Sequence, residues 1–193
     1  MNHFYALLSR MRHIRRWSLM VSHYPENLAE HSLMTAILAH GLAIIGRDIF
    51  GKSHADPNAC AAAALFHDAP EILTGDLPTP VKYFTPYLRK AYGEVEQAGT
   101  EKLLSMLPDG LREAYRPFLS PGECCTLVCE YVKAADKLSA YIKCKEELRA
   151  GNREFKEAQE SAIKKLSNMN MPEIEYFLEH FLPSFELTLD ELK

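Results

Sequence analysis

The chain has 193 residues, of which 47% are hydrophobic and 25% are charged, and its formal net charge at pH 7 is −4. This composition is typical of a soluble globular protein, and the negative charge argues against a protein that coats nucleic acid, which is normally basic. No run of about 18 apolar residues is present, and arginines interrupt residues 1–25, so the sequence predicts neither a membrane span nor a secretory signal. We therefore expect a single domain over residues 1–193, with no nucleic-acid or membrane partner.

The cysteines do not form the pattern of a disulfide-bonded scaffold, because their number is odd and no Cys-x-x-Cys pair occurs. They are Cys60, Cys124, Cys125, Cys129 and Cys144. Reduced, buried thiols on a helix face are the favoured interpretation, and a zinc site built on Cys125 and Cys129 is the minor alternative. The expected compartment is the reducing cytoplasm.

The first half of the chain predicts two long helices. One begins at Asn27, because Glu30 three residues later completes a capping box. Its apolar residues recur at helical spacing, at Leu33, Met34, Ile37, Leu38, Leu42, Ile44 and Ile45. The second begins at Asp56-Pro57, a cap followed by proline at the first helical position, and runs to about Asp68. Alanines at 59 and 61–64 in this helix predict close contact with another helix.

The rest of the chain also favours helices. Residues 74–80 are the exception, because a glycine and two prolines interrupt them. Further helices are expected over about 85–106, 109–119, 122–150, 153–168 and 172–181, and Gly151 ends the longest of them. No segment alternates with a period of two, so we expect an all-α fold.

Four potential metal ligands lie on three of these predicted helices. They are His31, His67, Asp68 and Asp136. Asp136 lies off the charged stripe of its helix, on a mostly apolar flank, where a carboxylate needs a partner. By periodicity alone, an ion pair with an arginine is favoured over a metal for Asp136, and a capping or core role over a metal for each histidine.

The density of polar groups around the adjacent His67 and Asp68 favours a catalytic role over a purely structural one. His67, Asp68, Glu71 and Asp76 fall within one short turn that prolines interrupt. Imidazole and carboxylate side chains are the ligands of catalytic metal sites, in which open positions are left for water and substrate. A structural turn has no need of so many such groups.

Several segments together resemble the bacterial HD-domain 5′-deoxynucleotidases, the YfbR-like group. They are NLAEHS at 27–32, LFHDAPE at 65–71, TGDLPTPVKYF at 74–84 and KAAD at 133–136, with Arg16-Trp17 upstream and FLPSF at 181–185. The likeness covers nearly the whole chain, and the 74–84 segment is more specific than the His…His-Asp…Asp pattern.

The resemblance implies an HD-domain helical bundle that binds one divalent cation, such as Mn²⁺, Co²⁺ or another transition metal. The implied ligands are His31, His67, Asp68 and Asp136, of which the two carboxylates also contact substrate. It further implies a homodimer that hydrolyses 2′-deoxynucleoside 5′-monophosphates to deoxynucleosides and orthophosphate.

The same resemblance suggests roles for the remaining polar residues. Glu71 is expected to orient or deprotonate the attacking water, and Asp76 to protonate the leaving oxygen, although the two roles are interchangeable. A solvent-exposed carboxylate at a helix end is the alternative for Glu71.

The substrate is expected to lie between two segments. Arg16 would bind the phosphate, and Trp17 would lie against the sugar and exclude a 2′-hydroxyl, with a core anchor as its alternative. Leu77, Pro78 and Thr79 would line the nucleotide pocket from the other side.

Three other functions remain open from the sequence. A deoxynucleoside triphosphohydrolase or a cyclic-nucleotide phosphodiesterase would use the same ligands, but a polyphosphate needs more basic groups than Arg16 and Lys82. A non-catalytic HD-like signalling module would not need the complete ligand set with Glu71.

Overall fold

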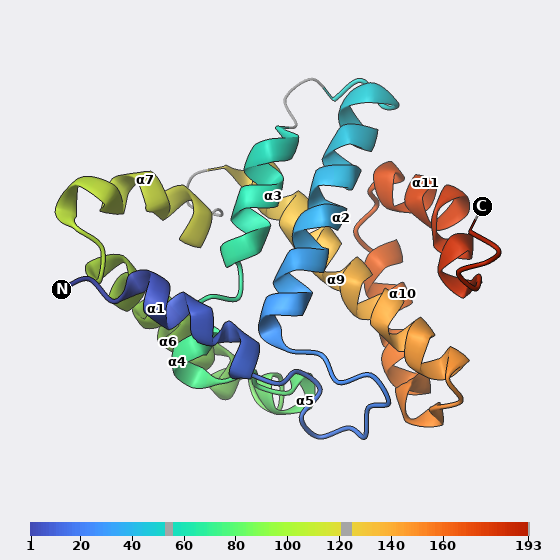
Figure 1. The fold of residues 1–193 in the computed structure, drawn as a ribbon, viewed down its shortest axis with the longest axis horizontal. Coiled ribbons are helices and arrows are strands. Elements are labelled where there is room, and N and C mark those ends of the chain that lie inside the picture. Colours follow the sequence, from blue (N-terminus) through green and yellow to red (C-terminus); the bar gives the residue numbers. More distant parts are fainter. Residues whose placement is uncertain (53–55, 121–124, 193) are drawn as a thin grey trace.

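The computed structural model describes residues 1–52, 56–120 and 125–192, and within these ranges it is built from helices, as the sequence predicts (Figure 1). The α-helices are α1 (Phe4–Leu8), α2 (Leu28–Asp48), α3 (Pro57–Phe66), α4 (Glu71–Thr74), α5 (Thr79–Lys82), α6 (Pro86–Ser105), α7 (Asp109–Leu119), α9 (Thr126–Arg149), α10 (Lys156–Ser167) and α11 (Pro172–His180). The 3-10 helices are η1 (Ser9–His13), η2 (Arg153–Phe155) and η3 (Leu182–Glu186). The predicted helix start near residue 122 and Cys124 lie outside the described residues.

Local capping explains where the two long helices of the first half begin. The Asn27 side chain accepts hydrogen bonds from the backbone of Ala29 and Glu30, and the Glu30 carboxylate accepts one from Asn27 N at 3.1 Å, which confirms the capping box. Asp56 caps α3 in the same way, by accepting from Asn58 N and Ala59 N. These caps satisfy backbone donors that the first helical turn leaves unpaired.

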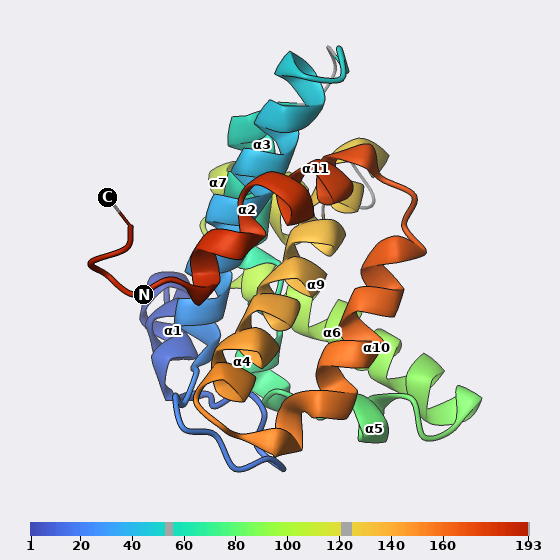
Figure 2. The ribbon, with the colours of Figure 1, turned by 90° about the vertical axis from the view of Figure 1, so that its right-hand side faces the viewer.

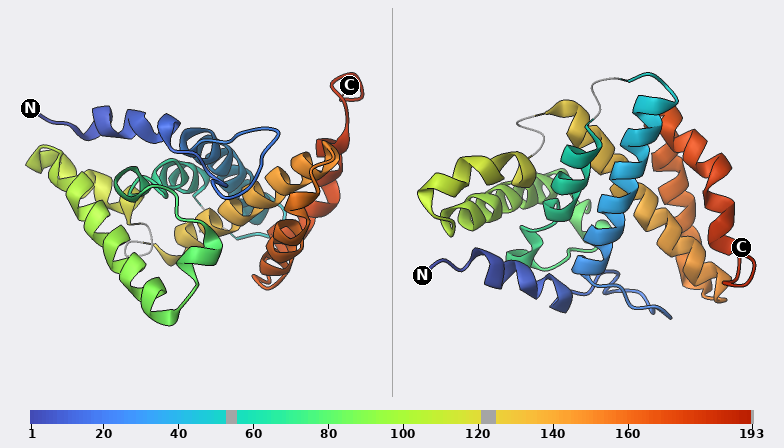
Figure 3. Two further views of the ribbon diagram at one scale, coloured as in Figure 1. Left: turned by 90° about the horizontal axis from the view of Figure 1, so that it is seen from below. Right: turned by 45° about the horizontal axis from the view of Figure 1, so that its top comes forward.

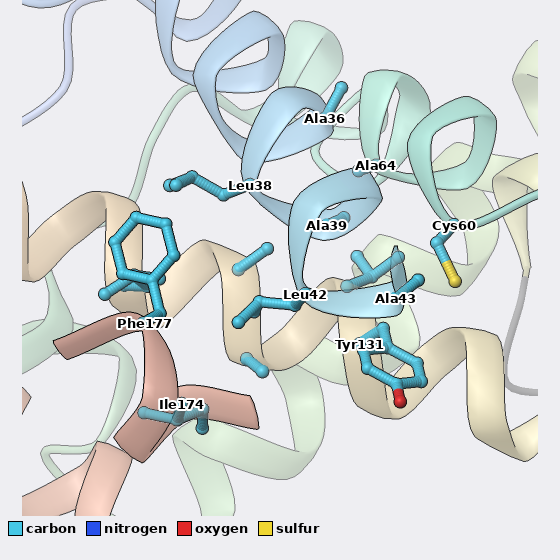
Figure 4. Packing of buried hydrophobic residues seen from close by; sticks show 14 of the residues in the cluster. Ala36, Leu38, Ala39, Leu42, Ala43, Cys60, Ala64, Tyr131, Ile174 and Phe177 are labelled. Carbon is cyan, nitrogen blue, oxygen red and sulfur yellow. The ribbon is translucent and has the colours of Figure 1, made fainter. Parts of the chain in front are cut away.

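The main core lies where α2 packs between α3, α9 and α11. Figure 4 shows Ala36, Ala39 and Ala43 of α2 beside Ala64 and Cys60 of α3. The small side chains on both helices permit the close contact that the alanine run predicts. On the other flank Leu42, Tyr131, Ile174 and Phe177 fill the space between α2, α9 and α11.

A second apolar cluster lies beside the first. It joins α1, α6 and α7 around Phe4, Ala69, Leu103, Leu104, Leu107 and Leu119. In Figure 1 and Figure 3 these helices lie at the opposite end of the molecule from α10 and α11, and the chain termini lie toward opposite ends of the long axis in Figure 1. Figure 2 shows the other end, where α10 packs beside α9. The segment after α3 joins the two clusters, since Ala69 belongs to the second one.

Gly46 marks the closest approach of α2 to its neighbours. A Cβ atom at this position would overlap the Tyr131 hydroxyl and would lie 2.8 Å from Glu173 Oε1. The space is occupied by a buried polar group, in which Tyr131 donates to Glu173 at 2.7 Å and Lys52 pairs with Glu173 at 2.6 Å. Only glycine fits there, so this contact sets the distance between α2 and α9.

Part of the predicted apolar stripe of α2 does not face the core. Leu33, Met34 and Ile37 are exposed, whereas Leu38, Leu42 and Ile45 are buried. Periodicity finds the apolar residues of a helix but does not say which of two apolar faces the core will use.

By length and composition α2 also passes the test for a membrane-spanning helix, with a mean hydropathy of 1.4 over its most apolar window. However, 56% of that window is buried inside the protein, as in the core helix of a globular domain.

Candidate active site

Three helices bring the four predicted ligands together. His31 lies in the first turn of α2, His67 caps the end of α3 and is followed by Asp68, and Asp136 lies in the middle of α9. His31 Nε2 lies 3.2 Å from Asp136 Oδ1 and 3.5 Å from Asp68 Oδ2, while His67 Nε2 lies 3.1 Å from Asp68 Oδ2. The packing of α2 against α3 and α9 therefore creates the cluster.

Hydrogen bonds on the far side of each imidazole fix its orientation. His67 Nδ1 lies 2.7 Å from the carbonyl oxygen of Ala64, which can only accept, so Nδ1 carries the proton and Nε2 faces the cluster. His31 Nδ1 lies 3.2 Å from the Ser139 hydroxyl. A metal-binding histidine is typically held in this way through its second nitrogen.

The cluster has a strongly negative potential. Burial alone would lower the pKa of His67, but Asp68 and then Asp136 raise it to about 9. Burial would raise the pKa of Asp68 and of Asp136, yet the imidazoles hold both below their usual values, His67 chiefly for Asp68 and His31 chiefly for Asp136. Positive charge is therefore strongly favoured at the centre of these four groups.

The donor set fits a divalent transition metal. One ligand atom from each of His31, His67 and Asp136 lies within 4.8 Å of the others, and Asp68 extends the group through both imidazoles. In the described residues, His67 Nε2 is buried without a hydrogen-bond partner. The Asp68 and Asp136 side chains keep 22% and 36% of their exposure, which leaves the cluster open on one side. Imidazole and carboxylate ligands in this number suit Mn²⁺, Fe²⁺, Co²⁺ or Zn²⁺.

The structure does not support the two alternatives, an arginine ion pair for Asp136 and a zinc site on Cys125 and Cys129. Asp136 contacts His31 directly, whereas Arg16 acts on it only through a longer-range electrostatic interaction. Asp136 is therefore not simply the ion-pair partner of an arginine. In the described ranges, no cysteine belongs to a metal-binding group, and Cys125 and Cys129 are free thiols.

Glu71 is buried beside the cluster and is not a solvent-exposed carboxylate. It begins α4, is 8% exposed, and its Oε2 atom has no hydrogen-bond partner in the part of the chain that the structure describes. Burial raises the pKa of Glu71 to about 9, and the nearby charges of Asp68 and Asp76 add to this effect. A carboxyl group with a raised pKa in a cleft is typical of acid–base catalysts.

A cavity of about 420 Å³ opens beside Glu71. It is lined by His67, Asp68, Pro70, Glu71, Glu96, Gln97, Thr100, Leu119 and Ser120. Since His67, Asp68 and Glu71 all line this cavity, it gives water access to this side of the cluster.

Asp76 lies in the turn between α4 and α5, where Gly75 adopts a φ of 75°. Burial raises the pKa of Asp76, whereas Arg16 and a hydrogen bond from the Trp17 backbone act in the opposite direction. Leu77 and Pro78 are partly buried and Thr79 is exposed at the start of α5. Asp76 in the broken segment therefore lies close to the loop that carries Arg16 and Trp17.

Arg16 also faces the site. Burial alone would lower its pKa, but Glu26, Asp136, Asp68 and Asp76 raise it, in that order. The guanidinium therefore remains charged next to the cluster, where an anionic substrate group would meet it.

Trp17 is partly buried rather than a fully buried core anchor. Its ring packs on Phe155 with a centroid distance of 5.2 Å, and its indole N–H donates to Glu26 at 3.1 Å. The backbone of Trp17 has a φ of 58°, a conformation that side chains of this size rarely adopt.

Sequence reasoning missed several residues that support the site. Ser139 follows Asp136 by one helical turn, so its position on the same face of α9 was readable from the spacing. Glu26 holds Arg16 and Trp17, and Lys82 pairs with Glu96 at 2.7 Å beside the cavity. Glu26 and Glu96 lie in no motif, and only the tertiary structure identifies them.

Comparison with known proteins gives a consistent result. Residues 3–185 match the model of the family described as 5′-deoxynucleotidase YfbR-like. The chain is 48% identical to a 5′-deoxynucleotidase of Vibrio vulnificus over 99% of this chain and 98% of that protein. It is 49% identical to a 5′-deoxynucleotidase of Vibrio parahaemolyticus with the same coverage.

Solved structures show the same fold. An HD-domain phosphohydrolase of Listeria innocua superposes with a TM-score of 0.82 at 28% identity, over 95% of this chain and 88% of that one. The HD phosphohydrolase of cyanophage S-2L, solved with dA and one catalytic Zn²⁺ ion, superposes with a TM-score of 0.70 at 20% identity, over 93% and 96% of the two chains. The predicted all-α HD-domain bundle is thus confirmed.

Proposed function

This chain belongs to the YfbR-like 5′-deoxynucleotidase family, and we propose that it is a metal-dependent phosphoric monoester hydrolase acting on 2′-deoxynucleoside 5′-monophosphates. The products are a deoxynucleoside and orthophosphate. The observation that carries the proposal is the convergence of His31, His67 and Asp136 within 4.8 Å, with the buried carboxyl group of Glu71 beside them.

The proposed ligands of a single divalent metal are His31, His67, Asp68 and Asp136. A bound divalent cation would activate a water molecule and neutralise charge on the phosphoryl oxygens. Ser139 and the Ala64 carbonyl orient the two imidazoles, so their ligand nitrogens face the cluster. The two carboxylates also contact substrate in this proposal.

The other residues of the site would bind the substrate and move protons. Arg16 binds the phosphate through its free N–H groups, and Glu71 orients or deprotonates the attacking water. Asp76 protonates the leaving 5′-oxygen. The raised pKa values of Glu71 and Asp76 support acid–base roles, since each carboxyl holds its proton more tightly than an exposed one.

Selection of the sugar and base would come from the two facing segments. Trp17 excludes the 2′-hydroxyl of a ribonucleotide by its bulk. Leu77, Pro78 and Thr79 line the pocket for the nucleotide from the opposite side. The proximity of Arg16 and Trp17 to Asp76 supports this arrangement, since burial raises the pKa of Asp76 and both of these residues act to lower it.

The proposal is tested by measuring orthophosphate release from ribo- and deoxynucleoside 5′-monophosphates by metal-free protein supplied with Mn²⁺, Co²⁺, Zn²⁺ or Mg²⁺. We expect release from deoxynucleotides in the presence of a transition metal and none with a chelator. Release of tripolyphosphate from deoxynucleoside triphosphates in place of orthophosphate would identify a triphosphohydrolase. Purified protein without metal and without activity would indicate a signalling module.

We also propose a homodimer in the cytoplasm. The exposed apolar side chains of Leu33, Met34 and Ile37 on α2 support a second copy as the partner, because monomers rarely expose contiguous apolar surface. Analytical ultracentrifugation at micromolar concentration should give twice the mass of the chain, and a monomer would contradict the proposal.

A further inference from the structure

One carboxylate oxygen holds both substrate-facing residues of the 14–27 loop. Glu26 Oε2 accepts a hydrogen bond from Arg16 Nη1 at 2.8 Å and from the indole N–H of Trp17 at 3.1 Å. The side chains of Arg16 and Glu26 are only 12% and 15% exposed, so solvent competes weakly for these bonds. We propose that Glu26 is a positioning residue that couples phosphate binding by Arg16 to sugar discrimination by Trp17; this inference rests on the function proposed above.

The backbone that carries Glu26 is fixed at the root of the loop. Arg16 N donates to the Glu26 carbonyl at 3.0 Å, and Arg15 and Asn27 form an antiparallel bridge. Asn27 is also the N-cap of α2. Glu26 therefore stands on a rigid base one turn before the metal ligand His31, and its carboxylate is a fixed point for the two side chains.

The far end of the loop is held separately. Glu147 of α9 accepts hydrogen bonds from His23 N and Tyr24 N at 2.9 Å each, and Glu154 accepts one from Val21 N at 2.9 Å. These bonds fix the course of the backbone, but none of them reaches the side chain of Arg16 or Trp17. Orientation of those two side chains depends on Glu26.

Trp17 needs such a partner because its backbone is strained. A φ of 58° is unfavourable in a bulky residue and persists only where surrounding contacts impose it. Packing on Phe155 holds the ring from one side, and the bond to Glu26 sets its rotation. Without that bond the indole can turn on Phe155 and lose its fixed position against the sugar.

Arg16 gains orientation without losing its capacity for phosphate. Among the described residues, Glu26 is the only side chain that accepts a hydrogen bond from Arg16. A guanidinium carries five N–H donors in a planar fork, so the remaining donors can bind a phosphate group. The charged bond to Glu26 fixes the plane of that fork.

Two substitutions at position 26 separate the two effects. Glu26→Gln keeps an acceptor oxygen for the indole but removes the charge that strengthens the bond to Arg16. We expect kcat/KM to fall about tenfold for dAMP and AMP alike, with their ratio unchanged. Glu26→Ala removes both bonds, so the ratio of kcat/KM for dAMP over AMP should also narrow, by up to about a hundredfold.

A double variant tests whether Glu26 acts through the indole. Trp17→Phe keeps an aromatic ring on Phe155 but has no N–H to donate. In this background Glu26→Ala should lower both kcat/KM values without narrowing the ratio further. An equal narrowing in both backgrounds, or a wild-type ratio in Glu26→Ala, would overturn the proposal.

Glu154→Ala is the matched control, because it removes a carboxylate that holds the same loop but touches neither side chain. It should leave the dAMP to AMP ratio unchanged. A ratio that narrows as much as in Glu26→Ala would mean that the loop backbone, and not the Glu26 contact, sets selectivity.

A readout without turnover separates this inference from the proposed function. Trp17 is the only tryptophan in the chain, so tryptophan emission reports on the surroundings of this one side chain. Acrylamide should quench it more strongly in Glu26→Ala than in Glu26→Gln or the wild type, even if no nucleotide is hydrolysed. Equal quenching in folded Glu26→Ala and wild type, checked by circular dichroism, would overturn the inference and leave the proposed function untouched.

Discussion

Two carboxylates on helix α9 lie three turns apart and have opposite surroundings. Asp136 faces two imidazoles and keeps 36% of its side chain exposed. Glu147 is fully buried and accepts hydrogen bonds from the Lys143 ammonium, the Asn152 amide and the backbone of the 14–27 loop. A buried carboxylate whose lone pairs are all filled by donors is structural, whereas one that meets other acceptors is available for a cation.

The clusters around Asp136 and Glu147 also differ in whether their buried polar atoms have hydrogen-bond partners. In the described residues, buried atoms without hydrogen-bond partners include His67 Nε2 and Glu71 Oε2, both beside the Asp136 cluster, and include no atom of Glu147 or Lys143. The first region is therefore set up to bind something further, and the second is complete.

The largest expected effect is loss of the metal site. His31→Ala or Asp68→Ala removes a proposed ligand, so bound metal and activity should both fall below detection. Metal content by mass spectrometry and orthophosphate release check this, with the exposed Asp109→Ala as control. Stoichiometric metal and intact turnover in both variants would mean that the cluster is structural after all.

Glu71→Ala should keep the metal and lower kcat by about 10²–10⁴-fold, the usual contribution of a positioned acid–base group. Single-turnover kinetics and metal analysis of the same sample test this expectation. Loss of the metal would make Glu71 a ligand, and near-normal turnover would exclude it from the mechanism.

Glu147→Ala should affect folding rather than chemistry. Removing one partner of a buried ion pair leaves Lys143 uncompensated, at a cost of about 3–5 kcal/mol in the free energy of unfolding. Chemical denaturation measures this cost, and the exposed neighbour Glu146→Ala is the control. Equal unfolding free energies of the two variants would show that the buried Lys143–Glu147 pair contributes little to stability.

The pH dependence of Glu147 adds a second test. Burial alone would raise its pKa, but the bonds from Lys143 and Asn152 lower it to about 2. Because the folded pKa lies below the unfolded value, the stabilisation is present above about pH 4.5 and is lost as the pH falls toward 2. The difference in unfolding free energy between the wild type and Glu147→Gln should therefore shrink from pH 7 to pH 3. A difference that stays constant with pH would show that the lowered pKa of Glu147 is not the source of the stabilisation.

The smallest expected effect concerns selectivity. Trp17→Ala should narrow the ratio of kcat/KM for dAMP over AMP, by at most about a hundredfold, chiefly by admitting AMP. The added hydroxyl would no longer meet the indole. If both values fall in parallel, Trp17 is a packing residue and selectivity must come from the segment at Asp76.

Asp136 and Glu147 also differ in how far the sequence could predict their roles. Helical periodicity placed Asp136 away from the charged stripe of α9, and the resemblance supplied its metal role. The same periodicity gave no reason to single out Glu147, because its backbone donors come from residues more than 100 positions earlier. A pattern along one helix reports burial, but the identity of distant partners depends on tertiary structure.

The fold was predicted well where capping and periodicity are strong, as at Asn27 and Asp56. The 14–27 loop was not, since its course depends on one β-bridge, the positive φ of Trp17 and contacts with α9. None of these leaves a periodic pattern. The prediction that Arg16 and Trp17 lie near Asp76 came from the resemblance, and not from local physics.

Gly46 has a consequence for the precision of the site. Metal–ligand bond lengths tolerate deviations of only about 0.2 Å, and the proposed ligands His31 and Asp136 lie on the two helices whose separation this glycine sets. A single added methyl group at Gly46, about four helical turns from His31, would wedge α2 away from Tyr131 and Glu173. Gly46, at the other end of the helix pair, would thus control the coordination geometry of the proposed metal site. A substitution there would change which metal the site prefers, although Gly46 contacts none of the proposed ligands.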